Sequence, residues 1–487
     1  MNAPRGMSLI DVVVGCALIL IVFVGLIGLL RASLLISGIA KARAGATAIA
    51  ETQLEYVRGL DYDIVGTVGG IPAGLVAATS TQILNGVTYE TRTLIVYVDD
   101  PKDGFGAADT NGIQTDYKQI KVEVSYSVRS TPHTISLISN YAPPGLETTT
   151  NGGTLSIAVV GATGAAVPGA TVSIQNSATA PTVSFTTFSD SLGFVQLPGA
   201  PTSTEYRIEV SKDGYSSAQT YLRDATNQNP TPGYLTVAAN QTTTSTFGVD
   251  VLAPFTLRTL HPIAPDATID TFADSTQLAN QTNTQVAGGA LVLSQTGPDY
   301  VLSGSARSVN IAPAYLSEWT SINAALSVPV GTTARVQVVD GDGVLLPDSV
   351  LAGNSTGFST FPVVLTGVST TTYPSLGLLA DLTTTSSSVT PQILDWRMDY
   401  RVGPTPFPNV SFTLTGTKTK GTTGAGAPIY KTTVASTTNA SGVFLSSLEW
   451  DVYSISIPGY TIDVASSTPT PFTIDPATSF EGTLILE

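Results

Sequence analysis

One acidic side chain, Asp11, interrupts the apolar N-terminal stretch of this chain. Residues 12–30 after it are uncharged and mostly Val, Leu, Ile and Gly. As a helix they would span roughly 28 Å, close to the thickness of a bilayer core. A carboxylate one turn inside such a segment raises the free energy of membrane insertion by roughly 3 kcal/mol, so we expect it to have a charge partner or a function. Neutralisation by an opposite charge in a low dielectric is the chemistry that would retain it.

The residues around Asp11 resemble the start of type IV prepilins. That family has a short basic leader, a Gly before the cleaved bond, a methylated residue after it and usually a Glu at the fifth mature position. Here the leader, residues 1–6, contains Arg5 and ends in Gly6, Met7 would be the first mature residue, and Asp11 stands at the fifth position, one methylene shorter than Glu. The resemblance implies a prepilin peptidase that cuts after Gly6 and methylates Met7. It also implies that Asp11 neutralises the Met7 amine of an adjacent pilin subunit during assembly.

Three other interpretations of the N-terminus stay open. A secretory signal would use Ala40-Lys41-Ala42 as its cleavage site, but its apolar region would be too long and would open with an acid. A lipoprotein signal would use Val13-Val14-Gly15-Cys16, yet uncharged residues continue well beyond Cys16. A plain uncleaved anchor would leave Gly6 and Asp11 without a role.

The helix is predicted to continue far beyond the membrane segment, over about residues 8–60. From 31 to 60, apolar and small side chains recur at steps of three and four, and the first turn signal is Gly59. Residues 48–62 are also similar to the helix end of minor pilins and of the smaller pseudopilins of type II secretion.

Three strand-like runs follow this helix, at residues 87–98, 120–128 and 134–141. They are rich in β-branched and aromatic residues, and the first alternates in a way that suits a sheet packed on one helix. A long helix followed by an antiparallel meander is the pilin arrangement. Residues 7–142 are therefore predicted to form a pilin module.

The loop between the first two of these runs is acidic and rich in Gly. Clustered carboxylates on a flexible loop can hold Ca²⁺, which accepts six to eight oxygen ligands. The spacing does not match an EF-hand, and Asp, Asn and Gly are also the usual residues of turns, so a solvated loop is the favoured interpretation. The possible Ca²⁺ ligands are Asp99, Asp100, Asp103, Asp109, Asn111 and Asp116.

Beyond a Pro-, Gly- and Thr-rich linker at 143–153, the chain is dense in Thr, Ser, Val and Gly and has the short alternating runs of half-buried strands. One unit occurs twice: a polar turn with Gly, a strand that opens on Tyr and a closing Gly-Tyr. The turns of the two copies start at Asp190 and Asn439. Residues 167–174 resemble carboxypeptidase regulatory-like and related Ig-like modules. The resemblance implies small β-sandwiches at 154–250 and 404–487 that serve as spacers or binding platforms.

The block between the two copies, residues 251–403, has the size of one jelly-roll sandwich and is similar to discoidin-like modules. In such folds the rim loops can bind glycans, and Trp319, Trp396 or Tyr373 could stack on a sugar ring. The favoured alternative is that both Trp residues belong to the core.

Composition limits the other functions. The net charge of −15 speaks against binding nucleic acid, whose phosphates need a basic surface. With two His residues and one Cys, zinc sites and His-based triads lack their parts, and no pair of acids is brought together by sequence spacing. We therefore expect no enzyme and no cofactor apart from possible Ca²⁺.

These observations predict an α+β pilin module, with a long N-terminal helix and an antiparallel sheet, followed by all-β sandwich domains. The predicted function is that of a minor type IV pilin which presents these sandwiches for adhesion or assembly priming. The helix would lie in the inner membrane, with its N-terminus cytoplasmic, before it joins other pilin subunits in an extracellular filament. A surface glycan or a host or substrate surface would be the ligand. A pseudopilin of a type II secretion or DNA-uptake machine and a membrane-anchored, glycan-active surface enzyme are the alternatives.

Overall fold

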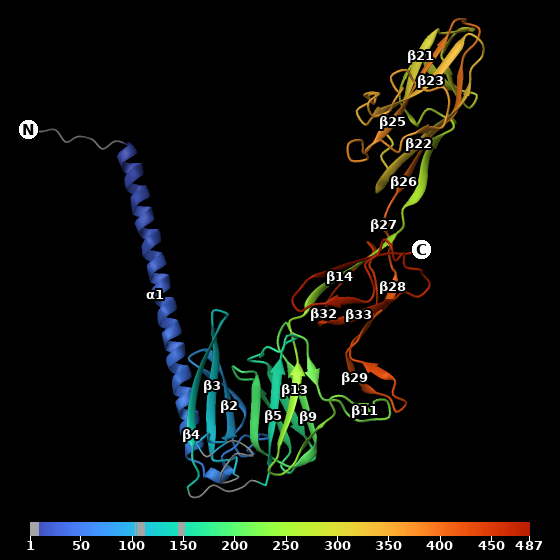
Figure 1. Cartoon of the computed structure of the whole chain (residues 1–487). Helices are drawn as coiled ribbons and strands as arrows, with labels where there is room; N and C mark the ends of the chain where they lie inside the picture. Colours follow the sequence, from blue (N-terminus) through green and yellow to red (C-terminus); the bar gives the residue numbers. More distant parts are fainter. Residues whose placement is uncertain (1–8, 103, 105–112, 145–150) are drawn as a thin grey trace, which may run out of the picture.

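The computed structural model describes residues 9–102, 104, 113–144 and 151–487. One long N-terminal helix is followed by a β-rich body of mainly antiparallel sheets, as the sequence predicts (Figure 1). The body divides into four hydrophobic clusters, each enclosed by its own strands.

The helix α1 (Leu9–Arg58) has two halves with different surroundings. Large apolar side chains of the N-terminal half, from Val13 to Ile36, are mostly exposed, and Figure 1 shows this half projecting from the body. From Ala42 to Val57 the helix buries one face against a four-stranded sheet, largely through small residues. Tyr89 of that sheet donates a hydrogen bond from its hydroxyl to the carbonyl oxygen of Ala42, at 3.0 Å.

The sheet against α1 is an antiparallel meander. Its strands in order are β1 (Thr79–Leu84), β2 (Val87–Val98), β3 (Tyr117–Val128) and β4 (Thr131–Tyr141). The three predicted runs correspond to β2, β3 and β4. Sequence analysis missed β1, because all of its residues are exposed and no apolar alternation marks it.

The first sandwich spans residues 153–250 and encloses a core of Val, Ile and Leu side chains. One of its sheets has the order β13-β5-β8, with β13 parallel to β5, and the other has the order β10-β9-β6-β7, with β12 beside β9. The strands are β5 (Gly153–Val160), β6 (Thr171–Asn176), β7 (Val183–Phe188), β8 (Phe194–Ala200), β9 (Ser203–Ser211), β10 (Ala218–Gln219), β12 (Leu235–Val237) and β13 (Thr242–Gly248).

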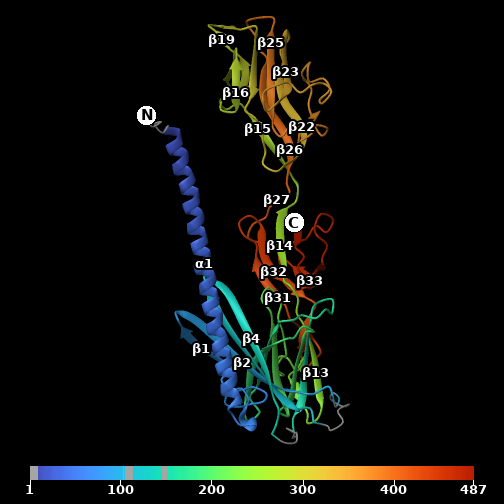
Figure 2. The same ribbon diagram turned by 90° about the vertical axis from the view of Figure 1, so that its left-hand side faces the viewer.

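The distal sandwich, residues 264–402, forms the far end of the body (Figure 2). Two sheets face each other across its core. The first has β15 (Ala264–Asp270), β17 (Thr284–Ala287), β18 (Ala290–Leu293), β22 (Leu316–Ser327), β24 (Val363–Val364) and β26 (Gln392–Val402). The second has β16 (Leu278–Thr282), β21 (Ser303–Ser308), β23 (Thr332–Asp340) and β25 (Leu376–Thr384); a short hairpin adds β19 (Gln295–Thr296) and β20 (Asp299–Tyr300).

The terminal sandwich differs from the predicted domain boundary. Its strand β14 (Ala253–His261) lies within the range assigned to the block 251–403, yet it pairs with strands near the C-terminus, and Phe255 and Leu257 are in the terminal core. The distal sandwich is therefore an insertion between β14 and β27 (Thr405–Pro406). Sequence analysis placed the boundary wrongly because strand pairing over such a separation leaves no local signal. The other strands are β28 (Ser411–Gly416), β31 (Thr433–Thr437), β32 (Val443–Leu448), β33 (Asp451–Ser456), β34 (Phe472–Ile474) and β35 (Phe480–Ile485).

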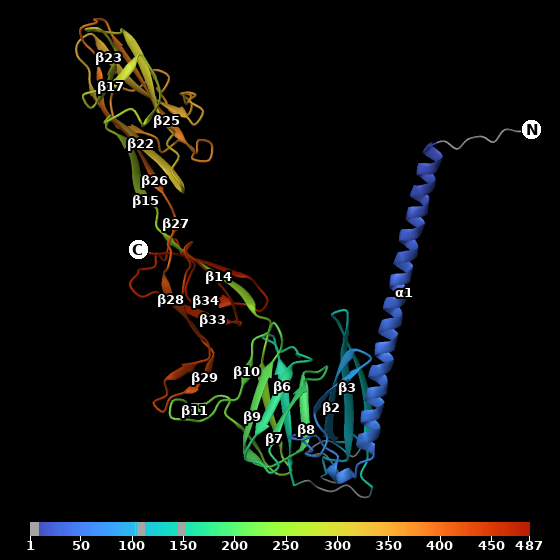
Figure 3. The ribbon, with the colours of Figure 1, turned by 180° about the vertical axis from the view of Figure 1, so that it is seen from behind.

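The terminal sandwich also reaches back to the first one. Its hairpin of β29 (Thr419–Thr422) and β30 (Pro428–Tyr430) pairs with β11 (Asn229–Pro230), and these elements lie side by side in Figure 3. The Nδ2 atom of Asn227 donates a hydrogen bond to the Lys420 carbonyl oxygen at 2.9 Å. The two modules are thus joined by a shared three-stranded sheet in addition to the chain itself.

The repeated unit found in the sequence has the same turn in both sandwiches. The side-chain oxygen of Asp190 accepts hydrogen bonds from the second and fourth following amides, and Asn439 does the same. Gly193 and Gly442 both have positive φ, and a Cβ at either would lie 2.6 Å from a carbonyl oxygen. Only Gly fits such a position, which explains why the repeat is visible in the sequence.

Candidate functional site

The predicted assembly site lies at the start of α1. Gly6 and Met7 are outside the described residues, and so is the side chain of Asp11, although its backbone is helical. Along the described chain, α1 is long and apolar enough to cross a membrane. Cleavage, methylation and charge pairing at these residues remain predictions.

The predicted Ca²⁺ loop is described only at its base. Asp103, Asp109 and Asn111 lie outside the described residues. The carboxylate of Asp116 accepts a hydrogen bond from the backbone N–H of Asp100, which ties the two ends of the loop together next to Asp99. Among the residues that the structure describes, no group of three or more His, Cys, Asp or Glu side chains is placed to hold a metal. Ca²⁺ binding here remains a prediction.

The proposed sugar-stacking role of Trp319 and Trp396 is wrong in this structure. Trp319 has no exposed surface and Trp396 is 2% exposed, because both rings fill the core of the distal sandwich. The Trp319 indole N–H donates a hydrogen bond to the carbonyl oxygen of Tyr373 at 2.8 Å. Tyr373 is partly buried and packs against the same core. These three residues hold the sandwich together and do not form an open aromatic platform.

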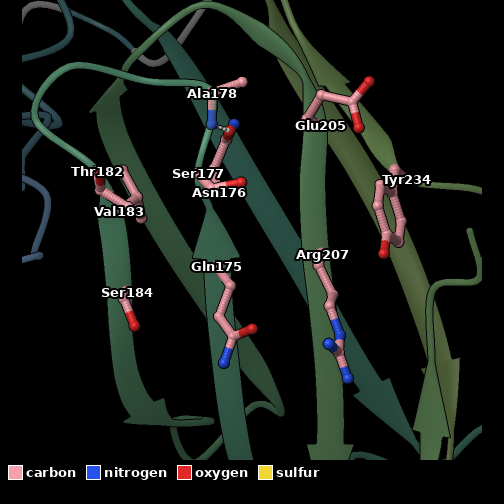
Figure 4. Close-up of a pocket in the computed structure, with 10 residues that line it drawn as sticks. All are labelled: Gln175, Asn176, Ser177, Ala178, Thr182, Val183, Ser184, Glu205, Arg207 and Tyr234. Carbon is pink, nitrogen blue, oxygen red and sulfur yellow. Dashed lines mark hydrogen bonds between the residues drawn. The ribbon is translucent and has the colours of Figure 1, made fainter.

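A groove that the sequence analysis did not find lies on the first sandwich. It covers the outer face of β6, β7 and β9, is bordered by Tyr234 just before β12, and has a volume of about 590 Å³. Figure 4 shows its ten lining residues. They are Gln175, Asn176, Ser177, Ala178, Thr182, Val183, Ser184, Glu205, Arg207 and Tyr234.

The floor of this groove is a row of side chains from neighbouring strands. Gln175 of β6 pairs with Ser184 of β7 on one side and with Arg207 of β9 on the other. Tyr234 directly precedes Leu235, which pairs with Tyr206, so the Tyr234 ring lies beside Arg207 at the far end of the row (Figure 4). Strands are about 4.8 Å apart, so a row across four strands is roughly 14 Å long.

The position of this row is set by the side chains on the opposite, core-facing side of the same strands. Alternation places Tyr206 and Ile208, on either side of Arg207, in the core with no exposed surface. The Tyr206 hydroxyl donates a hydrogen bond to the Pro201 carbonyl oxygen at 2.7 Å. Burial raises the pKa of this hydroxyl, so it stays protonated and keeps that bond.

A lining residue at one end of the groove, Asn176, has an unsatisfied amide. Asn176 is 2% exposed, and its Oδ1 atom accepts a hydrogen bond from the Ala178 backbone N–H at 3.0 Å. Its Nδ2 atom has no hydrogen-bond partner among the described residues. Asn176 alternates with the exposed Gln175 along β6, so its side chain lies on the same face as Val172 and Ile174, away from the groove floor.

The charges of the groove nearly cancel. Arg207 is half exposed and lies 3.8 Å from Glu209 on the same strand, and Glu205 lines the upper end. Amides, hydroxyls, one guanidinium and one phenol ring make up most of the polar surface. Such a set can hydrogen-bond a polar ligand and contact an apolar ring face, but it has no nucleophile paired with a base.

Sequence analysis had the signal for the side chains but not for the groove. The alternation of β6 and β9 predicts that Gln175 and Arg207 face away from the core. The concave shape depends on the loop 177–182, which joins β6 to β7, and on Tyr234, which comes from a later part of the chain. A flat solvated sheet face would give the same local pattern.

The first sandwich, which carries this groove, matches a known domain family. Residues 154–250 match the carboxypeptidase regulatory-like domain. This confirms the predicted resemblance for the first sandwich. The comparison with curated proteins found no match.

Comparison with solved structures found bacterial surface proteins at low similarity. The Bacillus anthracis TIE protein is 10% identical over 85% of this chain and 73% of its own, with a TM-score of 0.17. The streptococcal ancillary pilin is 10% identical over 84% and 94%, with a TM-score of 0.18. BcpA, the major pilin subunit of Bacillus cereus, is 11% identical over 69% and 99%, with a TM-score of 0.15. Superpositions this poor carry no functional inference.

Proposed function

We propose that this chain is a minor type IV pilin that carries its β-sandwiches at the filament tip or at low occupancy. The two-part environment of α1 is the observation that carries the proposal. The N-terminal half is an exposed apolar rod, and the C-terminal half packs through Ala42, Ala46 and Ala50 on an antiparallel meander. Such a rod is suited first to a membrane and then to packing among equivalent helices.

The size of the body supports the low occupancy. The first, terminal and distal sandwiches follow one another away from the pilin module, as Figure 1 shows. An arm of this bulk on every subunit would compete for space around a tightly packed helical core. At the tip, or on scattered subunits, the arm would be free to contact another surface.

The decisive measurement is mass spectrometry of the mature N-terminus of protein from the native envelope. We expect a chain that begins at Met7 and carries an N-methyl group. An intact Met1, a lipid on Cys16 or a start near Arg43 would contradict processing as a pilin.

Substitution of Asp11 tests assembly apart from insertion. We expect Asp11→Ala to insert into the membrane but to enter filaments at least about tenfold less than wild type, because the partner of the Met7 amine is lost. Asp11→Glu should retain incorporation, since the charge remains. Glu51→Ala, an exposed acid on the same helix, is the matched control. Incorporation of Asp11→Ala at the wild-type level would contradict the pairing.

A further inference from the structure

The groove on the first sandwich has a shape that a solvated sheet face does not need. The outer face of an antiparallel sheet is normally open to water. Here the loop 177–182 and Tyr234 border an open groove of about 590 Å³ over that face. Its volume lies within the usual range of small-ligand sites.

We propose that this groove binds a neutral oligosaccharide. The inference deepens the proposed function, on which it rests for display outside the cell, by naming the ligand class. Sugar hydroxyls both donate and accept hydrogen bonds, and they are matched by the amide of Gln175, the hydroxyl of Ser184 and the guanidinium of Arg207. The partly buried ring of Tyr234 offers an apolar face of the kind that packs against the C–H face of a sugar.

The arrangement of these groups favours a chain over a single small polar molecule. Gln175, Ser184 and Arg207 are in register on adjacent strands, so polar groups recur at about 4.8 Å along the floor. A polymer of similar units can use such a row at several positions at once.

The electrostatics favour a neutral sugar over an acidic one. The Arg207 guanidinium is the one cation among the lining residues, and Glu205 and Glu209 lie on the same strand. A polyanion would meet these carboxylates without a second positive charge. Neutral hydroxyls can accept from Arg207 and donate to Glu205.

Calorimetry on the full chain in detergent tests the proposal, with cellohexaose, maltohexaose and chitohexaose as neutral probes and an oligomer of galacturonic acid as the acidic one. We expect at least one neutral hexaose to bind, and the acidic oligomer to bind at least about tenfold more weakly. Arg207→Ala and Tyr234→Ala should each weaken binding about tenfold, since each removes a principal contact. Arg223→Ala, an exposed Arg on the same sandwich outside the groove, should bind as wild type.

Three results would overturn the proposal: no heat with any neutral hexaose at millimolar concentration, wild-type affinity in Arg207→Ala and Tyr234→Ala, or stronger binding of the acidic oligomer. Thermal melting of each variant shows that it is folded. Processing and filament incorporation are read separately in the same variants. A chain that binds hexaose but keeps Met1 would contradict the pilin assignment alone, and a methylated chain that ignores every hexaose would contradict the groove assignment alone.

Discussion

Lys118 is a buried cation that joins the end of α1 to the sheet. It is 1% exposed, and its Nζ atom donates hydrogen bonds to the carbonyl oxygens of Tyr62 and Val65 at 2.5 and 2.7 Å. It also lies 4.4 Å from the centroid of the Tyr62 ring. Burial lowers the pKa of Lys118 from 10.5 to about 8, and the negative charge of Asp63 opposes this only in part. Lys118 thus holds the segment 62–65 after the helix in place, although burial of its charge is unfavourable.

This lowered pKa predicts a specific pH dependence of stability. Between about pH 8 and pH 10.5 the unfolded chain binds more protons at Lys118 than the folded chain does, so the contribution of Lys118 to the free energy of unfolding should rise with pH in that window. The contribution can reach at most about 1.4 kcal/mol per pH unit. Denaturant unfolding across this range should show a shallower rise in Lys118→Met than in wild type. Equal slopes in the two proteins would contradict the lowered pKa.

The candidate sites show which residue roles a sequence can reveal. Asp11 was conspicuous because a charge in an apolar run is rare. Trp319 and Trp396 were ambiguous, since a Trp in a β-rich segment can be core or surface, and burial decided for the core. Tyr234 had no signal at all, because its place beside Arg207 depends on a strand pairing that forms only in the folded sandwich.

At the scale of elements, the helix face of α1 depends on small residues. A Cβ at Gly45 would lie 2.7 Å from the Tyr89 hydroxyl oxygen, whereas a Cβ at Gly38 would have no atom within 4 Å. Tyr89 is 2% exposed and its hydroxyl is bonded to Ala42, so it cannot move aside easily. Gly45 therefore sets how closely the helix approaches the sheet.

Paired substitutions in α1 separate helix propensity from this contact. Gly38→Ala should stabilise the helix by up to about 1 kcal/mol, because Ala has the higher propensity. Gly45→Ala should instead destabilise the pilin module by about 1–3 kcal/mol through overpacking against Tyr89. Thermal unfolding in detergent measures both. Equal stabilisation by the two variants would show that the sheet accommodates the methyl group.

The elements themselves were predicted with uneven success. The long helix and strands β2, β3 and β4 followed from periodicity, because each has one buried face. The exposed β1 and the assignment of β14 to the terminal sandwich did not, since one lacks a buried face and the other depends on partners far along the chain.

At the scale of the whole molecule, the arm turns back along the helix. Figures 1 and 2 both show the distal sandwich extending in the same direction as the N-terminal half of α1. A bilayer around that half of the helix would occupy the same space as the arm. A sandwich with a polar surface cannot enter the hydrocarbon core. Insertion of this helix into a bilayer, as the proposed function requires, would therefore force the arm to turn away, whereas a subunit outside the bilayer could keep it folded back.

The junction between the pilin module and the first sandwich offers a place for this rotation. Its contacts include a hydrogen bond from the Ser184 N–H to the Gly69 carbonyl oxygen at 2.7 Å, and Ile71, 2% exposed, packs in the core of the first sandwich. The guanidinium of Arg92 also lies over the ring of Phe188. The rotation would have to break these contacts and expose Ile71, which costs about 1.5–3 kcal/mol for this side chain.

Energy transfer between two fluorophores measures the rotation. In a Cys16→Ser background, labels at Arg43→Cys on the helix and Val330→Cys on the distal sandwich report their separation; both positions are exposed. We expect a longer separation in liposomes than in small detergent micelles, because only an extended bilayer reaches the arm. The same separation in both would contradict a bilayer-driven rotation.

The insertion of the distal sandwich also decides the order in which the chain can fold. Strand β14 leaves the ribosome roughly 180 residues before its partner β32, a delay of about 10–35 s at ordinary rates of synthesis. During that time Phe255 and Leu257 have no core to enter. Closing the roughly 140 residues between β14 and β27 as an unfolded loop would cost about 4 kcal/mol. Once the distal sandwich has folded, the pairing of β15 with β26 holds its two ends together. Folding of the distal sandwich therefore brings β14 and β27 of the terminal sandwich close to each other.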